Sequence, residues 1–287
     1  MTTPFLLNNF LVVDHVKEAL KEDVVYGDIS TDFLCDEDKE FTVYLKTRQD
    51  GIFCGEIPFR TVFEILGGVE LEFYVNDGGK IKKGDRIAKI KGSARSILTG
   101  ERLALNYAQR MSAIATKANK FSEKVKDYPV RIVDTRKNTP NFRMFEKYAI
   151  KCGGASLHRF NLSDCVMLKD NHIALCDGSI ELAVQKVRKN LSHAHKIEVE
   201  CDTVKQVHDC VKAGVDIIML DNMNTDDMKK CIKFIRESNP NAVIEASGGI
   251  NLDNIEDVAK TGVDVISTSS LVVAGTMDLG FDWEQDN

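Results

Sequence analysis

The sequence of 287 residues is poor in proline, has no excess of basic residues and contains no apolar stretch long enough to cross a membrane. Five prolines, no low-complexity run, 43% hydrophobic and 29% charged residues are typical of a folded, soluble protein. A formal net charge of −6 argues against a nucleic-acid-binding surface, which would usually show a basic balance or a basic stripe. Any basic cluster must therefore be local.

The eight cysteines show no CxxC spacing, and several fall in apolar strand or helix patterns where a thiol packs as a small hydrophobic group. We therefore expect reduced core cysteines in a cytoplasmic protein. The apolar run at 5–13 is interrupted by Asn8 and Asn9 and has no basic flank or cleavage site. We do not expect it to be a signal peptide.

The first third of the chain mixes helical and strand-like patterns. We expect an amphipathic helix and a polar loop up to about residue 34, a strand at 41–48, a helix at 56–66 and a strand at 69–75. The Asn-Asp-Gly-Gly turn at 76–79 and the Gly84-Asp85 turn bracket short alternating strands, which indicates a small mixed sheet. A long helix from 97 to about 126 should lead into a second domain.

From residue 130 the pattern changes to short, β-branched apolar runs separated by helical stretches, which is typical of buried parallel strands in βα units. The runs lie at 130–133, 165–168, 197–201, 215–220, 242–246 and 263–266. The pattern also allows a short extra strand near 155–159. Six or seven such units fit either an α/β barrel, complete or incomplete, or an open doubly wound sheet.

Polar residues follow every one of these runs, and their distribution favours the barrel. They are Asp134–Lys137, Lys169–His172, Glu200, Asp221-Asn222, Ser247–Gly249 and Ser267–Ser270. In a barrel the carboxyl ends of all strands converge on one mouth, whereas an open sheet concentrates its polar site near one switch point. The first residues of loops are polar in any protein, but polar side chains at the end of every strand indicate an active site.

Basic residues gather at these strand ends in a chain that is acidic overall. They are Arg136, Lys137, His158, Arg159 and Lys169. One or two of them could be ordinary surface charges, but five are harder to explain in that way. Because guanidinium groups suit carboxylates and phosphates, the cluster predicts a pocket for anionic, phosphorylated ligands.

Two acidic positions and one glycine pair complete the predicted site. Glu198 and Glu200 face the same side of one strand, with Glu200 nearer the mouth. Either could instead be one half of a buried salt bridge, an interpretation that suits Glu198 better than Glu200. Glu200 and Asp221 could hold a hard cation such as Mg2+ through water and substrate oxygens. In Ser247-Gly248-Gly249, glycines would let backbone N–H groups approach a phosphate.

Three histidines have more ordinary interpretations. His193 and His195 lie in a polar segment between a helix and a strand, so exposure in a loop is favoured over a metal pair. His172 follows a strand, and it could orient the site or serve only the local structure.

An ordered series of motifs across nearly the whole chain resembles the quinolinate phosphoribosyltransferase family, the type II phosphoribosyltransferases of NAD biosynthesis. The motifs are Gly100-Glu101-Arg102, Leu105-Asn106, Asp134-Thr135-Arg136-Lys137 with Pro140, Glu146-Lys147-Tyr148-Ala149, Gly153-Gly154, His158-Arg159, Leu168-Lys169-Asp170-Asn171-His172, Glu198-Val199-Glu200, Leu220-Asp221-Asn222 and Glu245-Ala246-Ser247-Gly248-Gly249-Ile250.

The resemblance implies a two-domain fold and a homodimer or larger homo-oligomer. An N-terminal open-faced α/β sandwich over residues 1–113, joined by the C-terminal tail 272–287, would stand beside an incomplete barrel of about seven strands over 114–271. It also implies active sites shared between subunits, because Arg102 would enter the site of the neighbouring subunit.

The resemblance further implies the reaction: phosphoribosyl pyrophosphate and quinolinate give nicotinate mononucleotide, pyrophosphate and CO2, with Mg2+ as the only cofactor. The implied catalytic residues are Lys137, Lys169, Glu200 and Asp221, and the last two would also hold the metal and the ribose hydroxyls. The implied substrate-binding residues are Arg102, Thr135, Arg136, His158, Arg159, Ser247, Gly248, Gly249, Thr268 and Ser269.

The sequence departs from the family pattern mainly at the last strand. Ser267-Thr268-Ser269-Ser270 stands where the family commonly has Ser-Val-Gly-Ala, and a histidine that follows in the family is missing. The Thr268 and Ser269 hydroxyls are the expected replacements as phosphate donors. This departure leaves open a relative that acts on another heterocyclic acid, like homologues encoded beside molybdate transporters, or a non-catalytic phosphate-binding protein. A Schiff base on Lys169 in an aldolase-type barrel is a further alternative.

Overall fold

The computed structural model describes residues 7–36 and 39–283, and these fall into two compact units. Of the described residues, the first unit comprises those up to 119, 139–154 and 272–283, and the second comprises 120–138 and 155–271. This division differs from the expected one because the segment 139–154 groups with the first unit although it follows the first barrel strand. Residues 1–6, part of the expected N-terminal helix and loop, and 284–287, part of the expected tail, lie outside the described residues.

The first unit is built on a four-stranded sheet in the order β12-β1-β5-β3. Its strands are β1 (Glu40–Thr47), β3 (Val69–Phe73), β5 (Arg86–Ser93) and β12 (Leu279–Trp283), and a separate short pair joins β2 (Gly51–Ile52) to β4 (Lys80–Ile81). Every pairing is antiparallel, so the expectation of a mixed sheet was wrong. The reason is that side chains alternate between the two faces of a strand in the same way in parallel and antiparallel sheets, so the pattern does not give strand direction.

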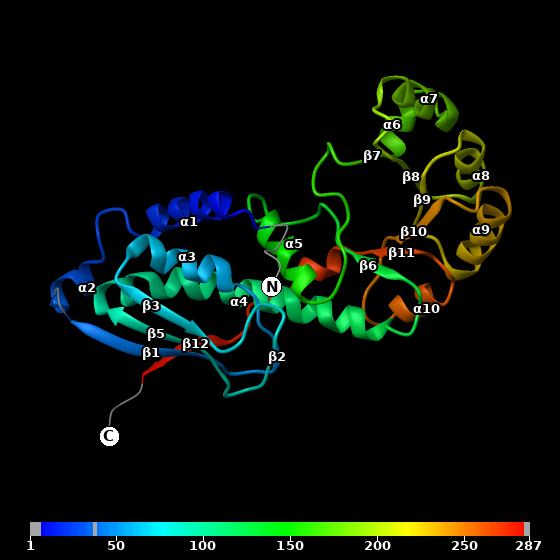
Figure 1. The fold of residues 1–287 in the computed structure, drawn as a ribbon. Helices are drawn as coiled ribbons and strands as arrows, with labels where there is room; N and C mark the ends of the chain where they lie inside the picture. The colour runs from blue at the N-terminus through cyan, green and yellow to red at the C-terminus, as the bar shows by residue number, and fades with distance from the viewer. Residues whose placement is uncertain (1–6, 37–38, 284–287) are drawn as a thin grey trace. The chain divides into compact units, whose positions relative to one another are not determined.

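The helices of the first unit are α1 (Asn9–Asp23), α2 (Ile29–Leu34), α3 (Glu56–Leu66), the 31-residue α4 (Ala94–Lys124) and α5 (Arg143–Cys152). In Figure 1, α1 and α3 lie along one side of the sheet. The apolar faces of α3 and the first half of α4 meet at Gly100, where an added Cβ would lie 2.8 Å from both Leu66 and Phe63. Fully buried phenylalanines of α3, Phe59 and Phe63, form the centre of this core.

The second unit contains a six-stranded parallel sheet in the order β6-β11-β10-β9-β8-β7 (Figure 1). The strands are β6 (Arg131–Val133), β7 (Val166–Leu168), β8 (Ile197–Cys201), β9 (Ile217–Asp221), β10 (Val243–Ser247) and β11 (Val265–Ser267). A parallel bridge from Val133 to Ser156 adds the start of a seventh position next to β6. These strands match the predicted apolar runs closely, and the incomplete α/β barrel is confirmed.

Helices between the strands cover the outside of the sheet. They are α6 (Asp170–Ala174), α7 (Ile180–Asn190), α8 (Val204–Ala213), α9 (Thr225–Ser238) and α10 (Ile255–Ala259), with a 3-10 turn, η1 (Ser269–Val272), after β11. The starts of α7, α8 and α9 are capped by side chains: Ser179 caps α7, Thr203 and Gln206 form a capping box on α8, and Asn224 accepts two backbone N–H bonds at α9. Such caps fix where each βα loop ends and therefore where the polar residues before it lie.

The eight cysteines are all free, and five of them are buried, as expected for reduced core thiols. In the part of the chain that the structure describes, no helix is long and apolar enough to span a membrane.

Candidate active site

A cavity of about 280 Å3 lies at the carboxyl ends of the barrel strands. Its lining contains residues at or just after the carboxyl ends of β6, β7, β8, β9, β10 and β11, as the barrel prediction requires. They are Thr135, Arg136, Lys137, His158, Arg159, Met167, Lys169, Glu200, Met219, Asp221, Ser247 and Ser267. All five predicted basic residues therefore lie around one hollow, together with both predicted acidic residues.

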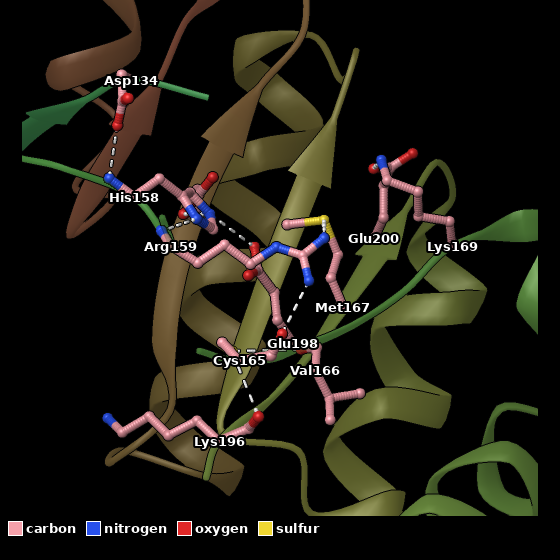
Figure 2. Close-up of polar contacts among 11 residues, drawn as sticks. Asp134, His158, Arg159, Cys165, Val166, Met167, Lys169, Lys196, Glu198 and Glu200 are labelled. Carbon is pink, nitrogen blue, oxygen red and sulfur yellow. Dashed lines mark hydrogen bonds and ion pairs between the residues drawn. The ribbon is translucent and has the colours of Figure 1, made fainter. Parts of the chain in front are cut away.

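The segment that carries His158 and Arg159 is held by the barrel interior. The buried carboxylate of Asp134 accepts the backbone N–H of His158 at 2.8 Å. The guanidinium of Arg159 donates to the backbone oxygen of Cys165 at 2.8 Å and reaches the sulfur of Met167 at 3.5 Å (Figure 2). Arg159 is thus fixed in direction and retains N–H groups for an anionic ligand.

His158 lies between two buried carboxylates. Its Nε2 is 3.4 Å from an oxygen of Glu198 and 3.4 Å from an oxygen of Glu245. Burial alone would lower the pKa of His158, but the hydrogen bonds and charges of these carboxylates raise it to about 10. Burial raises the pKa of Glu198, although His158 opposes that shift. Glu198 therefore forms the buried ion pair that was one of its two predicted interpretations.

Glu200 and Asp221 present carboxylates to the same cavity from neighbouring strands. Glu200 forms a short ion pair with Lys169, and Asp221 accepts a 2.7 Å bond from the side chain of Asn222. The second oxygens of Glu200 and Asp221 remain available to Mg2+, which is usually held by one or two carboxylates while water and substrate oxygens supply the rest. The residues present therefore fit the expected ion.

Gly248 is required by the close approach of two loops. Its φ of +88° is a left-handed conformation, and an added Cβ would lie 2.8 Å from the backbone nitrogen of Asn222. That nitrogen donates to the backbone oxygen of Ser247 at 3.0 Å. Gly249 also has positive φ, at +64°. The glycines thus let β9 and β10 end side by side, but of this motif only Ser247 lines the cavity.

Comparisons with known proteins agree with one another over almost the whole chain. Residues 114–282 match the model of the quinolinate phosphoribosyl transferase C-terminal domain, and residues 28–112 match that of its N-terminal domain. The chain belongs to the quinolinate phosphoribosyltransferase family.

Individual relatives support the same assignment. The chain is 40% identical to a probable carboxylating nicotinate-nucleotide pyrophosphorylase of Synechocystis, over 91% of this chain and 88% of that protein. It is 36% identical to the carboxylating nicotinate-nucleotide pyrophosphorylase of Rattus norvegicus, over 80% of this chain and 77% of that one. Its fold is similar to the nicotinate-nucleotide pyrophosphorylase structure from Francisella tularensis, with a TM-score of 0.91, 35% identity, and coverage of 97% and 98%.

At the last strand, where the sequence departs from the family pattern, the structure favours Ser267 over the expected hydroxyls. The Thr268 hydroxyl donates to the backbone oxygen of Ile250 at 2.7 Å, and Thr268 is buried and does not line the cavity. Ser269 begins η1 and is also outside the lining. The buried Ser267 hydroxyl lines the cavity and has no hydrogen-bond partner among the residues the structure describes. Ser267 is thus better placed as a donor to a ligand.

Sequence reasoning about the family missed the apolar part of the lining. Met167 and Met219 line the cavity from β7 and β9. Each faces the barrel interior by strand parity, since Met167 is two residues before Lys169 and Met219 two before Asp221. That parity was a usable signal, but an apolar residue in an apolar run does not stand out.

Other predicted residues lie elsewhere. Arg102 is an exposed residue of α4 in the first unit. His172 accepts the backbone N–H of Lys169 at 3.0 Å in a cap of α6, which is the structural alternative for this residue. His193 and His195 are exposed, as expected.

Proposed function

We propose that this member of the family transfers the phosphoribosyl group of phosphoribosyl pyrophosphate to quinolinate, with loss of CO2, as a carboxylating nicotinate-nucleotide pyrophosphorylase. The observation that carries this proposal is the single cavity that combines five basic and two acidic side chains at the carboxyl ends of the barrel strands. A dicarboxylate and a sugar pyrophosphate are both anionic, and a pocket of this charge suits both.

The basic residues would divide between the two substrates. Arg136, His158, Arg159 and Lys169 would hold the quinolinate carboxylates, and Lys137, which is exposed at the rim, would neutralise the departing pyrophosphate. The Ser247 and Ser267 hydroxyls, with backbone groups near Gly248, are the expected donors to the 5-phosphate.

The chemistry then follows from positioning and charge. The lone pair of the pyridine nitrogen attacks the anomeric carbon, the bond from that carbon to pyrophosphate breaks, and pyrophosphate leaves with its electron pair. Glu200 and Asp221 would stabilise the oxocarbenium-like charge on the ribose. When bound, Mg2+ would add positive charge beside the pyrophosphate oxygens.

Decarboxylation requires no further cofactor. The carbon–carbon bond to the 2-carboxylate breaks, CO2 leaves, and the electron pair stays on the ring carbon beside the cationic nitrogen before solvent supplies a proton. The ring is the electron sink, so the protein's contribution is orientation.

Substrate selectivity tests the proposal. With Mg2+ and phosphoribosyl pyrophosphate, we expect kcat/KM for quinolinate to exceed that for nicotinate by at least about tenfold, because nicotinate lacks one charge-assisted carboxylate contact. Lys137→Gln should lose activity, whereas Lys196→Gln, a lysine near the amino ends of the strands, should retain it. Equal use of the two acids, or turnover of neither, would contradict the proposal.

We also propose that the active sites are shared in a homodimer or larger homo-oligomer, with Arg102 serving the partner subunit. Its support is the exposure of Arg102 on α4, together with the family membership of the chain. Arg102→Ala and Lys137→Ala should each be inactive alone. Mixing them should restore about a quarter of wild-type activity, because half of random dimers are hybrids with one intact site in two. Hybrids that form but remain inactive would show that Arg102 does not act across the interface.

A further inference from the structure

A cluster of metal-ligating side chains lies in the first unit, in a different part of the fold from the cavity described above. The thiols of Cys54 and Cys152 and a carboxylate oxygen of Asp77 all lie within 4.8 Å of one another. Cys54 immediately precedes the capping residue of α3, Asp77 lies in the turn between β3 and β4, and Cys152 ends α5. Three segments far apart in the sequence therefore bring together two sulfur ligands and one oxygen ligand.

The carboxylate of Asp77 is held in a fixed direction. One oxygen accepts the backbone N–H groups of Gly55 at 2.7 Å and Glu56 at 2.9 Å, and the other accepts the hydroxyl of Tyr148 at 2.9 Å. These bonds leave a further lone pair on the oxygen that faces Tyr148. Ligating carboxylates in metal sites are commonly oriented by such second hydrogen bonds.

The backbone that carries the inner thiol is also held in place. The backbone of Cys54 is fixed at both ends by Ser112, whose hydroxyl accepts its N–H at 2.9 Å and donates to its oxygen at 3.0 Å. Cys54 is fully buried, and Cys152 is half-buried. A rigid inner ligand and a partly accessible outer one provide both preorganisation and a route of entry.

We propose that Cys54, Asp77 and Cys152 bind one zinc ion, with water in the fourth position. Tetrahedral zinc with sulfur at about 2.3 Å separates two thiolates by about 3.8 Å, so small side-chain rotations bring all three ligands to one ion. Thiolates select zinc over magnesium, which prefers oxygen ligands. The site is therefore distinct from the Mg2+ expected at the barrel mouth, and it does not depend on the proposed activity.

The chain contains a matched control for this proposal. The sulfurs of Cys201 and Cys210 are 3.3 Å apart and buried, but in the described part of the chain no third ligand completes that pair. A second control variant separates the proposed metal binding by Asp77 from its role in capping the start of α3. Asp77→Asn retains an amide oxygen that can accept the N–H groups at the start of α3, but it replaces the charged ligand with a weak one.

The test uses the full-length chain without a histidine tag, titrated with Co2+ as a spectroscopic probe and then with Zn2+. We expect one Co2+ per chain with thiolate-to-cobalt charge-transfer absorption, and displacement by equimolar Zn2+. Cys152→Ser should abolish that absorption, Asp77→Asn should weaken Co2+ binding at least tenfold, and Cys210→Ser should leave both unchanged.

Any of the following results would overturn the proposal. The first is no charge-transfer absorption in the folded wild-type chain, and the second is its loss in Cys210→Ser but not in Cys152→Ser. The third is unchanged affinity in Asp77→Asn, which would reduce Asp77 to a helix cap. A Cys54–Cys152 disulfide in the protein as purified would also exclude the zinc site.

Discussion

Two sets of contacts have opposite effects on the protonation of the His158 imidazole. The backbone N–H of Arg159 donates to its Nδ1 at 2.7 Å, which requires a lone pair there, while Glu198 and Glu245 at Nε2 favour a second proton on the ring. Two buried negative charges outweigh one neutral hydrogen bond, because charge-assisted bonds are about twice as strong. We therefore expect the ring to be a cation at neutral pH. The sequence placed His158 at the site, but a protonation state depends on neighbours forty and more residues away.

Replacement of one carboxylate tests this charge. The pKa of His158 in the folded protein, about 10, exceeds the ordinary value of 6.5. Protonation of His158 therefore stabilises the folded state fully below about pH 6.5, and this contribution is lost as the pH rises towards 10. Glu245→Gln should lower the pKa of His158, followed by NMR, by about 1–2, because one charge-assisted bond is removed. The exposed Glu181→Gln should leave it unchanged. A wild-type His158 that titrates near 6.5 would mean that the Arg159 bond prevails.

Among single residues, the hydroxyls after β11 show where sequence reasoning is limited. Ser267, Thr268 and Ser269 are adjacent and chemically alike, so their order along the chain does not reveal which one faces the cavity. Backbone direction decides it: Thr268 turns its hydroxyl to the oxygen of Ile250, and Ser267 ends the strand with its hydroxyl towards the cavity. The departure from the family pattern therefore still leaves a donor at the mouth.

Among the elements, the barrel strands were the most predictable because burial on both faces forces continuous β-branched runs. The run at 197–201 coincides with β8, and the one at 263–266 differs from β11 by only one or two residues. The helix α5 was less predictable. It follows β6 in sequence, as a barrel helix would, yet its buried Phe145 and Tyr148 belong to the first unit. A periodic apolar face shows that a helix is buried but not against which partner.

The sheet of the first unit also shows that a local sequence pattern does not identify the partner of an element. Alternating patterns and the Asn-Asp-Gly-Gly turn indicated strands, and β3 and β5 are present. Strand direction was misjudged because alternation is the same in parallel and antiparallel sheets. The strand β12 pairs antiparallel with β1 but begins more than 230 residues after β1 ends, a distance over which no local pattern carries information.

For the whole molecule, family membership and fold rest on matches across both units, and the distribution of charge gives them chemical meaning. An acidic chain concentrates five basic side chains at one end of a parallel sheet. Such local concentration attracts anionic substrates without making the surface generally basic. The central proposal is that phosphoribosyl transfer and decarboxylation both occur at that cavity, coupled to each other.

Coupling can be measured directly with quinolinate labelled in the carboxylate next to the ring nitrogen, in the presence of Mg2+ and phosphoribosyl pyrophosphate. We expect labelled CO2, pyrophosphate and unlabelled nicotinate mononucleotide in equal amounts, and no labelled CO2 when phosphoribosyl pyrophosphate is omitted, because the ring becomes an electron sink only after its nitrogen is alkylated. Label retained in the nucleotide product, or CO2 released without phosphoribosyl pyrophosphate, would contradict the proposed function.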